Sequence, residues 1–185
     1  MTSPGPTADV SVRIAWADDA RGIAEVQVAA WRTAYADLLP PEELAAFDVD
    51  AFAKGWHASL TRPQDARNRV LVALERNRIV GFAITSPGSD PDCDPVADGE
   101  VSDFTVLPLE QRKGHGSRLQ QAVVDTLAAD RFTRALTWVN SSDDVLRTFF
   151  GDAGWAPDQA HRELDLYGDG SVTVKQVRLH TAIDG

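Results

Sequence analysis

The sequence predicts an α+β fold in which a mixed, mainly antiparallel sheet carries helices on both faces. Short segments with alternating or continuous apolar residues, typical of strands, occur near both ends and in the middle of the chain. Other segments repeat apolar residues at three and four residue steps, as amphipathic helices do. One strand, helix, strand order has two largely apolar strands, which indicates a parallel pair joined by a right-handed crossover.

The first half of the chain predicts one strand, two helical regions and a hairpin. Residues 10–15 alternate as a strand does, and Asp18 or Asp19 can cap a helix that runs to about Tyr35. A second helical region follows Pro40 and Pro41, breaks near Asp48 and ends at about Leu60. Strands at 69–74 and 79–86 flank a tight polar turn at 75–78. The stripe expected to be buried on the first helix consists of Ile23, Val26, Ala30, Trp31 and Ala34.

The second half predicts the crossover and a final hairpin. A loop at 87–99 precedes a strand at 100–107, a helix at 116–129 and a strand at 135–140. Ser141 or Ser142 is expected to cap a helix that Gly154 ends. Two last strands are expected at about 160–167 and 171–179, with their turn at 168–170.

Composition favours one soluble globular domain at 10–185 after a disordered tail at 1–9. The 185 residues are 43% hydrophobic and 25% charged, and no apolar run reaches the length of a membrane span. The first residues do not resemble a signal peptide, so a cytoplasmic location is expected by default. The formal charge of −10 argues against a nucleic-acid partner. Cys93, the single cysteine, is expected to be an ordinary loop thiol.

The chemistry concentrates in the loop QRKGHG, Gln111 to Gly116, which opens the helix at 116–129. A helix start presents unpaired N–H groups and a positive dipole end, and glycines let the backbone approach a phosphate closely. Three basic residues lie in the same turn of an otherwise acidic protein. Neither G-x-G-x-x-G nor G-x-x-x-x-G-K-[ST] is present, so the spacing disfavours a dinucleotide or ATP site. The basic residues are Arg112, Lys113 and Arg118.

The stretch TVLPLEQRKGHGSRLQQAVVD resembles the acyl-CoA motif of the GNAT superfamily, an apolar strand followed by Q/R-x-x-G-x-G/A and a helix. Gln111, Gly114 and Gly116 match the motif. Asn140 and the segment VLRTFFGDAGWAPD are similar to the second signature of the family. The segment AAWRTAYADLLP in the first helix also resembles many bacterial members, so the resemblance covers nearly the whole chain.

The resemblance implies an N-acetyltransferase that moves an acyl group from acetyl-CoA to a primary amine of a small molecule, peptide or protein by direct attack in a ternary complex. It also implies that the sheet splays between its two central parallel strands and that the pantetheine arm fills the gap. No metal is expected. The residues implied for CoA binding are Phe104, Thr105, Val106, Gln111, Arg112, Lys113, Gly114, His115, Gly116, Ser117, Asn140 and Phe149.

A base near the gap must take a proton from the acceptor amine. Glu100 is the first candidate because it lies eleven residues before Gln111, a spacing at which several family members carry a glutamate base, and Asp103 is the substitute. An amide close to Val106 is expected to polarise the acyl carbonyl. Many family members protonate the departing thiolate with a tyrosine, where this chain has Phe150. Either the thiolate leaves with help only from the helix terminus and water, or another hydroxyl such as Tyr35 supplies the proton.

Other polar and aromatic residues have simpler interpretations. His115 is expected to pack or face solvent, and His57 and His161 are isolated. The aspartates at 90, 92 and 94 imitate a calcium loop, but Pro95 and Val101 stand where that loop requires glycine and glutamate. Core packing is expected for most of Trp16, Trp31, Trp56 and Tyr35, which could otherwise line an acceptor pocket.

Two alternatives to an enzyme stay open. A non-catalytic acyl-CoA-binding regulatory module would keep the same loop, and a general phosphate-binding domain would show no preference for CoA over ATP. A homodimer through the terminal strands or the acceptor-side helices is also possible.

Overall fold

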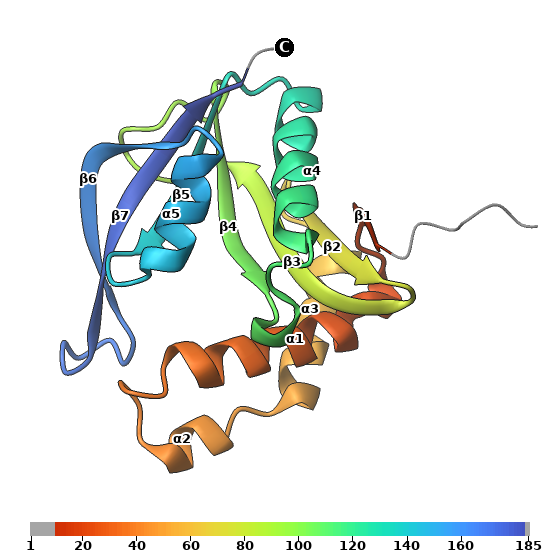
Figure 1. The fold of residues 1–185 in the computed structure, drawn as a ribbon, viewed down its shortest axis with the longest axis vertical. Helices are drawn as coiled ribbons and strands as arrows, with labels where there is room; N and C mark the ends of the chain where they lie inside the picture. The colour runs from red at the N-terminus through yellow and green to blue at the C-terminus, as the bar shows by residue number, and fades with distance from the viewer. Residues whose placement is uncertain (1–9, 184–185) are drawn as a thin grey trace, which may run out of the picture. The chain divides into compact units, whose positions relative to one another are not determined.

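The computed structural model describes residues 10–183 (Figure 1). The tail predicted at 1–9 therefore lies outside the described residues. In chain order the elements are β1 (Val10–Ile14), η1 (Ala17–Asp19), α1 (Ala20–Ala34), α2 (Pro41–Ala45), α3 (Val49–Thr61), β2 (Arg69–Glu75), β3 (Arg78–Pro87), β4 (Asp98–Val106), η2 (Pro108–Glu110), α4 (His115–Ala129), β5 (Arg134–Asn140), α5 (Asp144–Asp152), β6 (Ala156–Asp165) and β7 (Thr173–Ala182).

The predicted α+β class is confirmed. The strands of the described chain form a seven-stranded sheet in the order β1-β2-β3-β4-β5-β7-β6. β4 and β5 are parallel, as the apolar strand, helix, strand order predicted, and the pairs β1–β2, β5–β7 and β6–β7 are antiparallel.

The structure corrects four local predictions. Of the stripe expected to be buried on α1, Ala30 and Trp31 are only half-buried and Ala34, the last residue of the helix, is exposed. Asp143, and not Ser141 or Ser142, caps α5, because its carboxylate accepts the N–H of Leu146 at 2.9 Å. Asp19 precedes α1, but its carboxylate accepts from Arg13 and the Trp16 N–H instead of capping the helix. β6 begins four residues earlier than expected, with a register irregularity between Pro157 and His161 that interrupts the alternating pattern.

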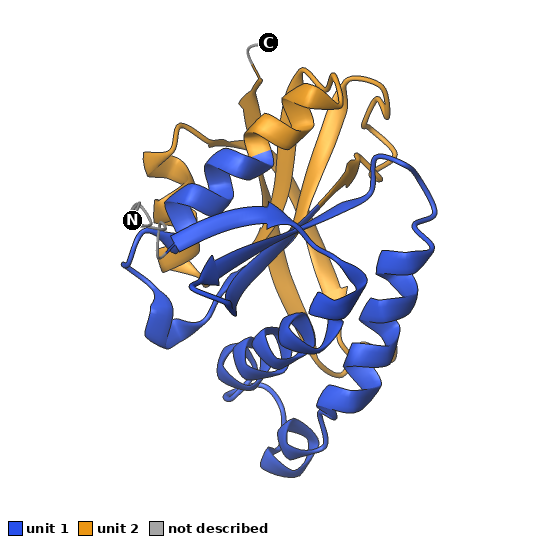
Figure 2. Ribbon diagram, turned by 90° about the vertical axis from the view of Figure 1, so that its right-hand side faces the viewer, with its two compact units in different colours: residues 1–84, 103–123 blue, residues 85–102, 124–185 orange. Residues whose placement is uncertain are grey.

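The chain divides into two compact units (Figure 2). Unit 1 comprises residues 1–84 and 103–123, and unit 2 comprises residues 85–102 and 124–185. β3, β4 and α4 each begin in one unit and end in the other. The expectation of one domain stays a prediction.

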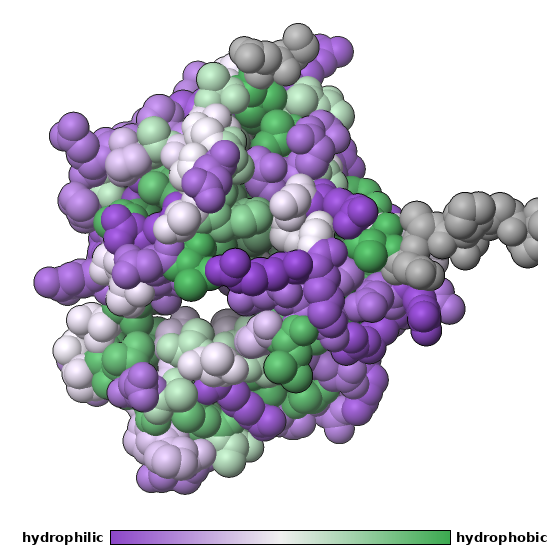
Figure 3. Space-filling model, in the orientation of Figure 1, coloured by the Kyte–Doolittle hydropathy of each residue, from purple (hydrophilic) through white to green (hydrophobic). Residues whose placement is uncertain are grey.

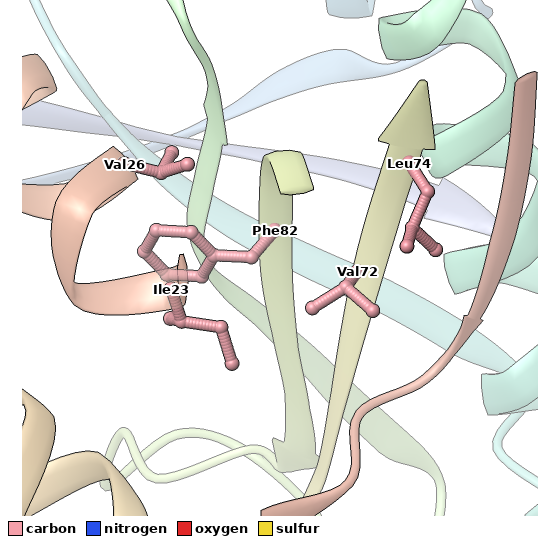
Figure 4. Close-up of a cluster of buried hydrophobic side chains, with 5 residues drawn as sticks. All are labelled: Ile23, Val26, Val72, Leu74 and Phe82. Atoms are coloured by element: carbon pink, nitrogen blue, oxygen red, sulfur yellow. The ribbon is translucent and has the colours of Figure 1, made fainter. Parts of the chain in front are cut away.

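Unit 1 is organised around an apolar cluster between α1 and the hairpin β2–β3 (Figure 4). Ile23 and Val26 come from α1, and Val72 and Phe82 come from the strands; each is at most 1% exposed. Burying a side chain of this size stabilises a fold by about 1.5–3 kcal/mol. Trp56 of α3 packs edge-on against Phe82, with ring centroids 5.3 Å apart, so it belongs to this core as predicted.

The two faces of β2 carry different chemistry. Val72 and Leu74 face the cluster beneath α1 and α3. Because successive strand residues point to opposite faces, Glu75 projects from the other face. There its carboxylate lies 3.5 Å from the imidazole of His115, the first residue of α4. The start of α4 therefore lies on the opposite face of this strand from α1.

Unit 2 contains the parallel ladder, which joins Asp98–Val101 of β4 to Arg134–Thr137 of β5. Phe150 of α5 and Trp155 are buried, with ring centroids 4.9 Å apart. Arg178 of β7 is 5% exposed and pairs with Asp90, Asp92 and Asp158. This guanidinium links the acidic loop after β3 to β7, which explains Asp90 and Asp92 of the segment that resembled a calcium loop.

Hydropathy describes the surface that one view of the molecule exposes. The face in Figure 3 is largely hydrophilic with scattered hydrophobic side chains. Within residues 10–183, no helix combines the length and the apolar character that crossing a membrane requires.

Candidate functional site

The predicted phosphate loop begins directly after β4 and η2. Gln111 has an extended backbone, Arg112 and Gly114 have φ of 61° and 89°, and α4 starts at His115. Among the described residues, no acceptor is found for the backbone N–H groups of Arg112 through Ser117, and Arg118 donates the first N–H to Gly114, at 3.2 Å. Six consecutive N–H groups thus remain available at the positive end of a helix dipole.

Position 114 requires glycine because of its backbone conformation and not because a side chain would lack space. Its φ of 89° is strained for any side chain, and an added Cβ would meet only Arg118 Nη1, at 2.7 Å. That contact also shows that the Arg118 guanidinium lies over the loop. The loop therefore combines unpaired N–H groups with a cation above its glycine.

The loop cations differ in their pairing. Lys113 Nζ lies 2.7 Å from Glu110 Oε2, and Arg78 bonds the other oxygen of Glu110. Lys113 and Arg78 together lower the pKa of Glu110 to about 2, so this buried carboxylate stays ionised. No carboxylate partner is found for Arg112 or Arg118 within the described chain. These two arginines carry the charge that is left for an anion.

The last part of β4 belongs to the same unit as the loop. Gln111 Nε2 donates to the carbonyl of Val106 at 3.3 Å, which ties the loop to the strand end. A Cβ on Gly81 of β3 would lie 2.7 Å from the Thr105 carbonyl oxygen and 3.2 Å from Val106 Cγ2. β3 thus supports from one side the strand segment Phe104–Val106 that was predicted to bind the pantetheine arm.

Asp103 marks an irregularity within β4. Its φ is 51°, a left-handed conformation in the middle of a strand. Solvent reaches its side chain, and the surrounding protein atoms still desolvate the carboxylate and raise its pKa above the ordinary value. Burial also raises the pKa of Tyr35 at the end of α1, and the Asp103 charge raises it further. The Asp103 charge therefore acts on the Tyr35 phenol.

Glu100 has a different environment. It is 8% exposed and accepts from the Ser89 hydroxyl at 2.8 Å and from the Ser89 N–H at 3.2 Å. These contacts all lie within unit 2. The first candidate base is thus a buried carboxylate with a fixed hydrogen-bond donor, whereas the substitute, Asp103, is reached by solvent.

The predicted residues of the second signature also lie in unit 2. Asn140 ends β5, and its Oδ1 accepts from Gln176 at 3.0 Å. Phe149 is half-buried on α5, with its ring 5.5 Å from that of Phe150. Phe150 is 1% exposed, so the position of the family tyrosine is part of the hydrophobic core.

The aromatic residues of the first helix group as follows. Trp31 packs edge-on against Tyr35, Phe47 and Phe52, with ring centroids 6.1, 5.7 and 5.3 Å away. Trp16 is 64% exposed beneath the guanidinium of Arg13, so core packing was wrong for this residue. Trp31 and Tyr35 stay half-buried.

Sequence reasoning missed Glu75, Gly81, Ser89 and Glu110. Glu75, Gly81 and Ser89 act on predicted site residues from other elements of the chain, and Glu110, three positions before Lys113, is held in addition by Arg78, 32 positions away. No local pattern marks such residues, because only the folded sheet brings them next to the loop and β4.

The Acetyltransferase (GNAT) family model matches residues 28–155. The chain belongs to this GNAT family. It is an acyl-CoA-dependent N-acyltransferase with a mostly antiparallel mixed sheet, as the resemblance implied.

Two kinds of relatives agree with this assignment. The uncharacterized N-acetyltransferase YuaI of Bacillus subtilis (strain 168) is 27% identical over 130 residues, 70% of this chain and 71% of YuaI. The ribosomal-protein-S5-alanine acetyltransferase of Vibrio fischeri has a TM-score of 0.71 at 16% identity, covering 97% of this chain and 96% of that one. The PaiA N-acetyltransferase of Thermoplasma acidophilum, solved in complex with coenzyme A, has a TM-score of 0.63 at 14% identity, covering 90% and 97%. At these identities the two structures support the fold.

Proposed function

We propose that this GNAT enzyme binds the diphosphate of acetyl-CoA with the backbone N–H groups of Arg112 through Ser117 and transfers the acetyl group directly to a primary amine. The unpartnered run of six N–H groups at the start of α4 carries this proposal. Such groups favour a diphosphate, because each phosphate oxygen can accept several of them without competition from the protein. Arg112 and Arg118 add charge to the same turn.

The thiol arm is proposed to follow β4 from the loop towards Phe104, with the Val106 amide polarising the acyl carbonyl. Gly81 supports the proposal, because a side chain there would press on Thr105 and Val106. The contributions of Asn140 and Phe149 to cofactor binding stay predictions.

Asp103 is our preferred general base. A base must exchange protons with an incoming amine, and Asp103 is open to solvent with a raised pKa, which brings its basicity closer to working pH. Glu100 is buried and already accepts two hydrogen bonds from Ser89. We keep Glu100 as the alternative base, acting through water.

The loop is tested by calorimetry with acetyl-CoA on the Gly114→Asp variant. The new side chain would combine a strained φ with a carboxylate facing the diphosphate, so we expect affinity to fall by about 100-fold or more. Gly168→Asp is the matched control, since Gly168 also has a positive φ, of 75°, with nothing within 4 Å of an added Cβ. Equal affinity for acetyl-CoA in both variants would place the diphosphate elsewhere.

Catalysis is tested separately by release of free CoA thiol over a panel of primary amines. The absence of a hydroxyl at the buried Phe150 favours one second candidate, a member of the family that binds acyl-CoA without turnover. Tight acetyl-CoA binding with no thiol release for any amine supports that candidate. A cytoplasmic location, a homodimer and independence from metal remain part of the proposal.

A further inference from the structure

His115 lies within the proposed diphosphate loop, but its side chain points into the protein. The residue is 1% exposed, and neither ring nitrogen has a hydrogen-bond partner in the described chain. Its Nε2 lies 3.5 Å from Glu75 Oε2, a buried oxygen atom that makes no hydrogen bond and has Arg78 Nη2 4.0 Å away. Native proteins seldom leave two buried polar atoms unpaired next to each other, because each loses its hydrogen bonds to water. A small movement of the two side chains towards each other would let these two atoms form a hydrogen bond.

The charges around the imidazole come from four elements. Glu75 projects from β2, Arg78 from β3, Glu110 from η2 and Lys113 from the loop itself. Arg118 of α4 lies over Gly114 on the ligand side. When the imidazole is neutral, the negative charges of the two carboxylates cancel the positive charges of Arg78 and Lys113. A diphosphate bound to the loop would add negative charge to this balanced cluster.

We propose that His115 is a positioning residue that takes up a proton when CoA binds, and that its imidazolium then donates Nε2–H to Glu75 while its charge offsets the diphosphate. The inference rests on the proposed function of the loop. The fixed link to Glu75 would hold the first residue of α4, and with it the row of N–H groups, against β2. Because coupling between a ligand and a proton is reciprocal, CoA must bind more tightly as the pH falls through the range in which histidine titrates.

A divalent metal ion is the competing ligand of the same side chains. One donor atom each of Glu75, Glu110 and His115 lie within 4.8 Å of one another. The ammonium of Lys113 and the guanidinium of Arg78 already hold both oxygens of Glu110 and would repel a second cation. A proton on the imidazole adds less charge than a divalent ion and needs only the Glu75 oxygen as its partner. The structure therefore favours the proton.

Calorimetry with dephospho-CoA at about pH 6, 7 and 8 tests the proposal. This ligand lacks the 3′-phosphate, whose second ionisation would otherwise titrate in the same range as histidine. We expect the dissociation constant of the wild-type protein to fall about fivefold to tenfold from pH 8 to pH 6. Buffers of different ionisation enthalpy should report proton uptake on binding. His115→Gln should bind with nearly no pH dependence, while His57→Gln, at an exposed histidine of α3, should keep the wild-type slope.

The outcomes separate the hypotheses. Binding by the wild-type protein without a pH slope, or an unchanged slope in His115→Gln, would overturn the role of His115 while leaving the proposed loop intact. No binding at any pH would instead overturn the proposed function. Saturable binding of Zn²⁺ alone, lost in His115→Gln, would replace the proton by a metal. If His115→Gln is unfolded by circular dichroism, Glu75→Gln serves as the second variant and should flatten the slope in the same way.

Discussion

Asp103 combines a left-handed backbone with a desolvated carboxylate, and both features cost stability. Aspartate and asparagine are the side chains that tolerate a positive φ best, which fits the φ of 51° at this position. Desolvation raises the pKa of the carboxyl, so the charged form is disfavoured in the folded protein. Strain and desolvation of this kind collect where a residue serves function more than packing.

Asp103→Asn should lower activity and raise stability at neutral pH. Activity should fall by about 10²- to 10⁴-fold because asparagine cannot accept the amine proton. The folded carboxyl has the higher pKa, so the wild-type protein loses stability as pH rises from the unfolded value, about 4, through the raised folded value. The stability gained by Asp103→Asn should therefore appear above that pH range and vanish below about pH 4.

Thermal unfolding and rates across pH measure both effects, and Glu100→Gln is the companion variant. Wild-type rates should decline as acid protonates Asp103. A variant Asp103→Asn with full activity, together with a pH-dependent loss in Glu100→Gln, would move the base to Glu100.

The close approach of β3 to β4 at Gly81 is the main element-scale feature of the proposed cofactor site. The Thr105 carbonyl oxygen lies 2.7 Å from the position that a Cβ of residue 81 would take. A carbonyl oxygen of a strand cannot turn aside as a flexible side chain can. Any side chain at 81 must therefore displace the segment Phe104–Val106.

Gly81→Ala should weaken acetyl-CoA binding and cost about 1–3 kcal/mol of unfolding free energy. Gly55→Ala in α3 is the matched control, because an added Cβ there meets nothing within 4 Å, and alanine should stabilise the helix by up to about 1 kcal/mol. Urea denaturation and calorimetry measure the two quantities. Unchanged acetyl-CoA affinity in Gly81→Ala would argue that the thiol arm does not follow β4.

At the scale of the whole molecule, the cationic loop contrasts with a formal charge of −10. An acidic protein repels an anionic cosubstrate at long range, so attraction must come from the short-range charges of Arg112 and Arg118. Salt screens both contributions, but the direct contact dominates once the diphosphate is bound.

The affinity for CoA should therefore fall with salt, by about threefold to tenfold between about 0.05 and 0.5 M NaCl. Arg112→Ala should bind more weakly in low salt and show a shallower salt dependence. Arg62→Ala, at an exposed arginine that follows α3, should behave as the wild-type protein does. Identical salt dependence in all three proteins would mean that Arg112 does not contact the anion.

Periodicity predicted the order of strands and helices, because apolar spacing reports directly which face an element buries. The start of β6 was missed because Pro157 and the left-handed Gln159, with φ of 72°, break the alternation. The loop at Gln111 could be identified because its determinants are contiguous. The pairing of Glu100 with Ser89 and of His115 with Glu75 could not, because residues 11 and 40 positions apart meet only through the sheet.

The phenyl ring of Phe150, 4.9 Å from the Trp155 ring, has no proton to give at the position where many family members carry a tyrosine. We propose that a sulfur anion leaving the thioester is protonated by water or by Tyr35. Burial and the Asp103 charge raise the pKa of the Tyr35 phenol, which therefore stays protonated. Installing a hydroxyl by Phe150→Tyr would bury an unsatisfied polar atom in the core, and so would not simply restore the missing acid. On this proposal, the acid for the departing sulfur comes from the solvent or from the residue that follows α1, and not from position 150.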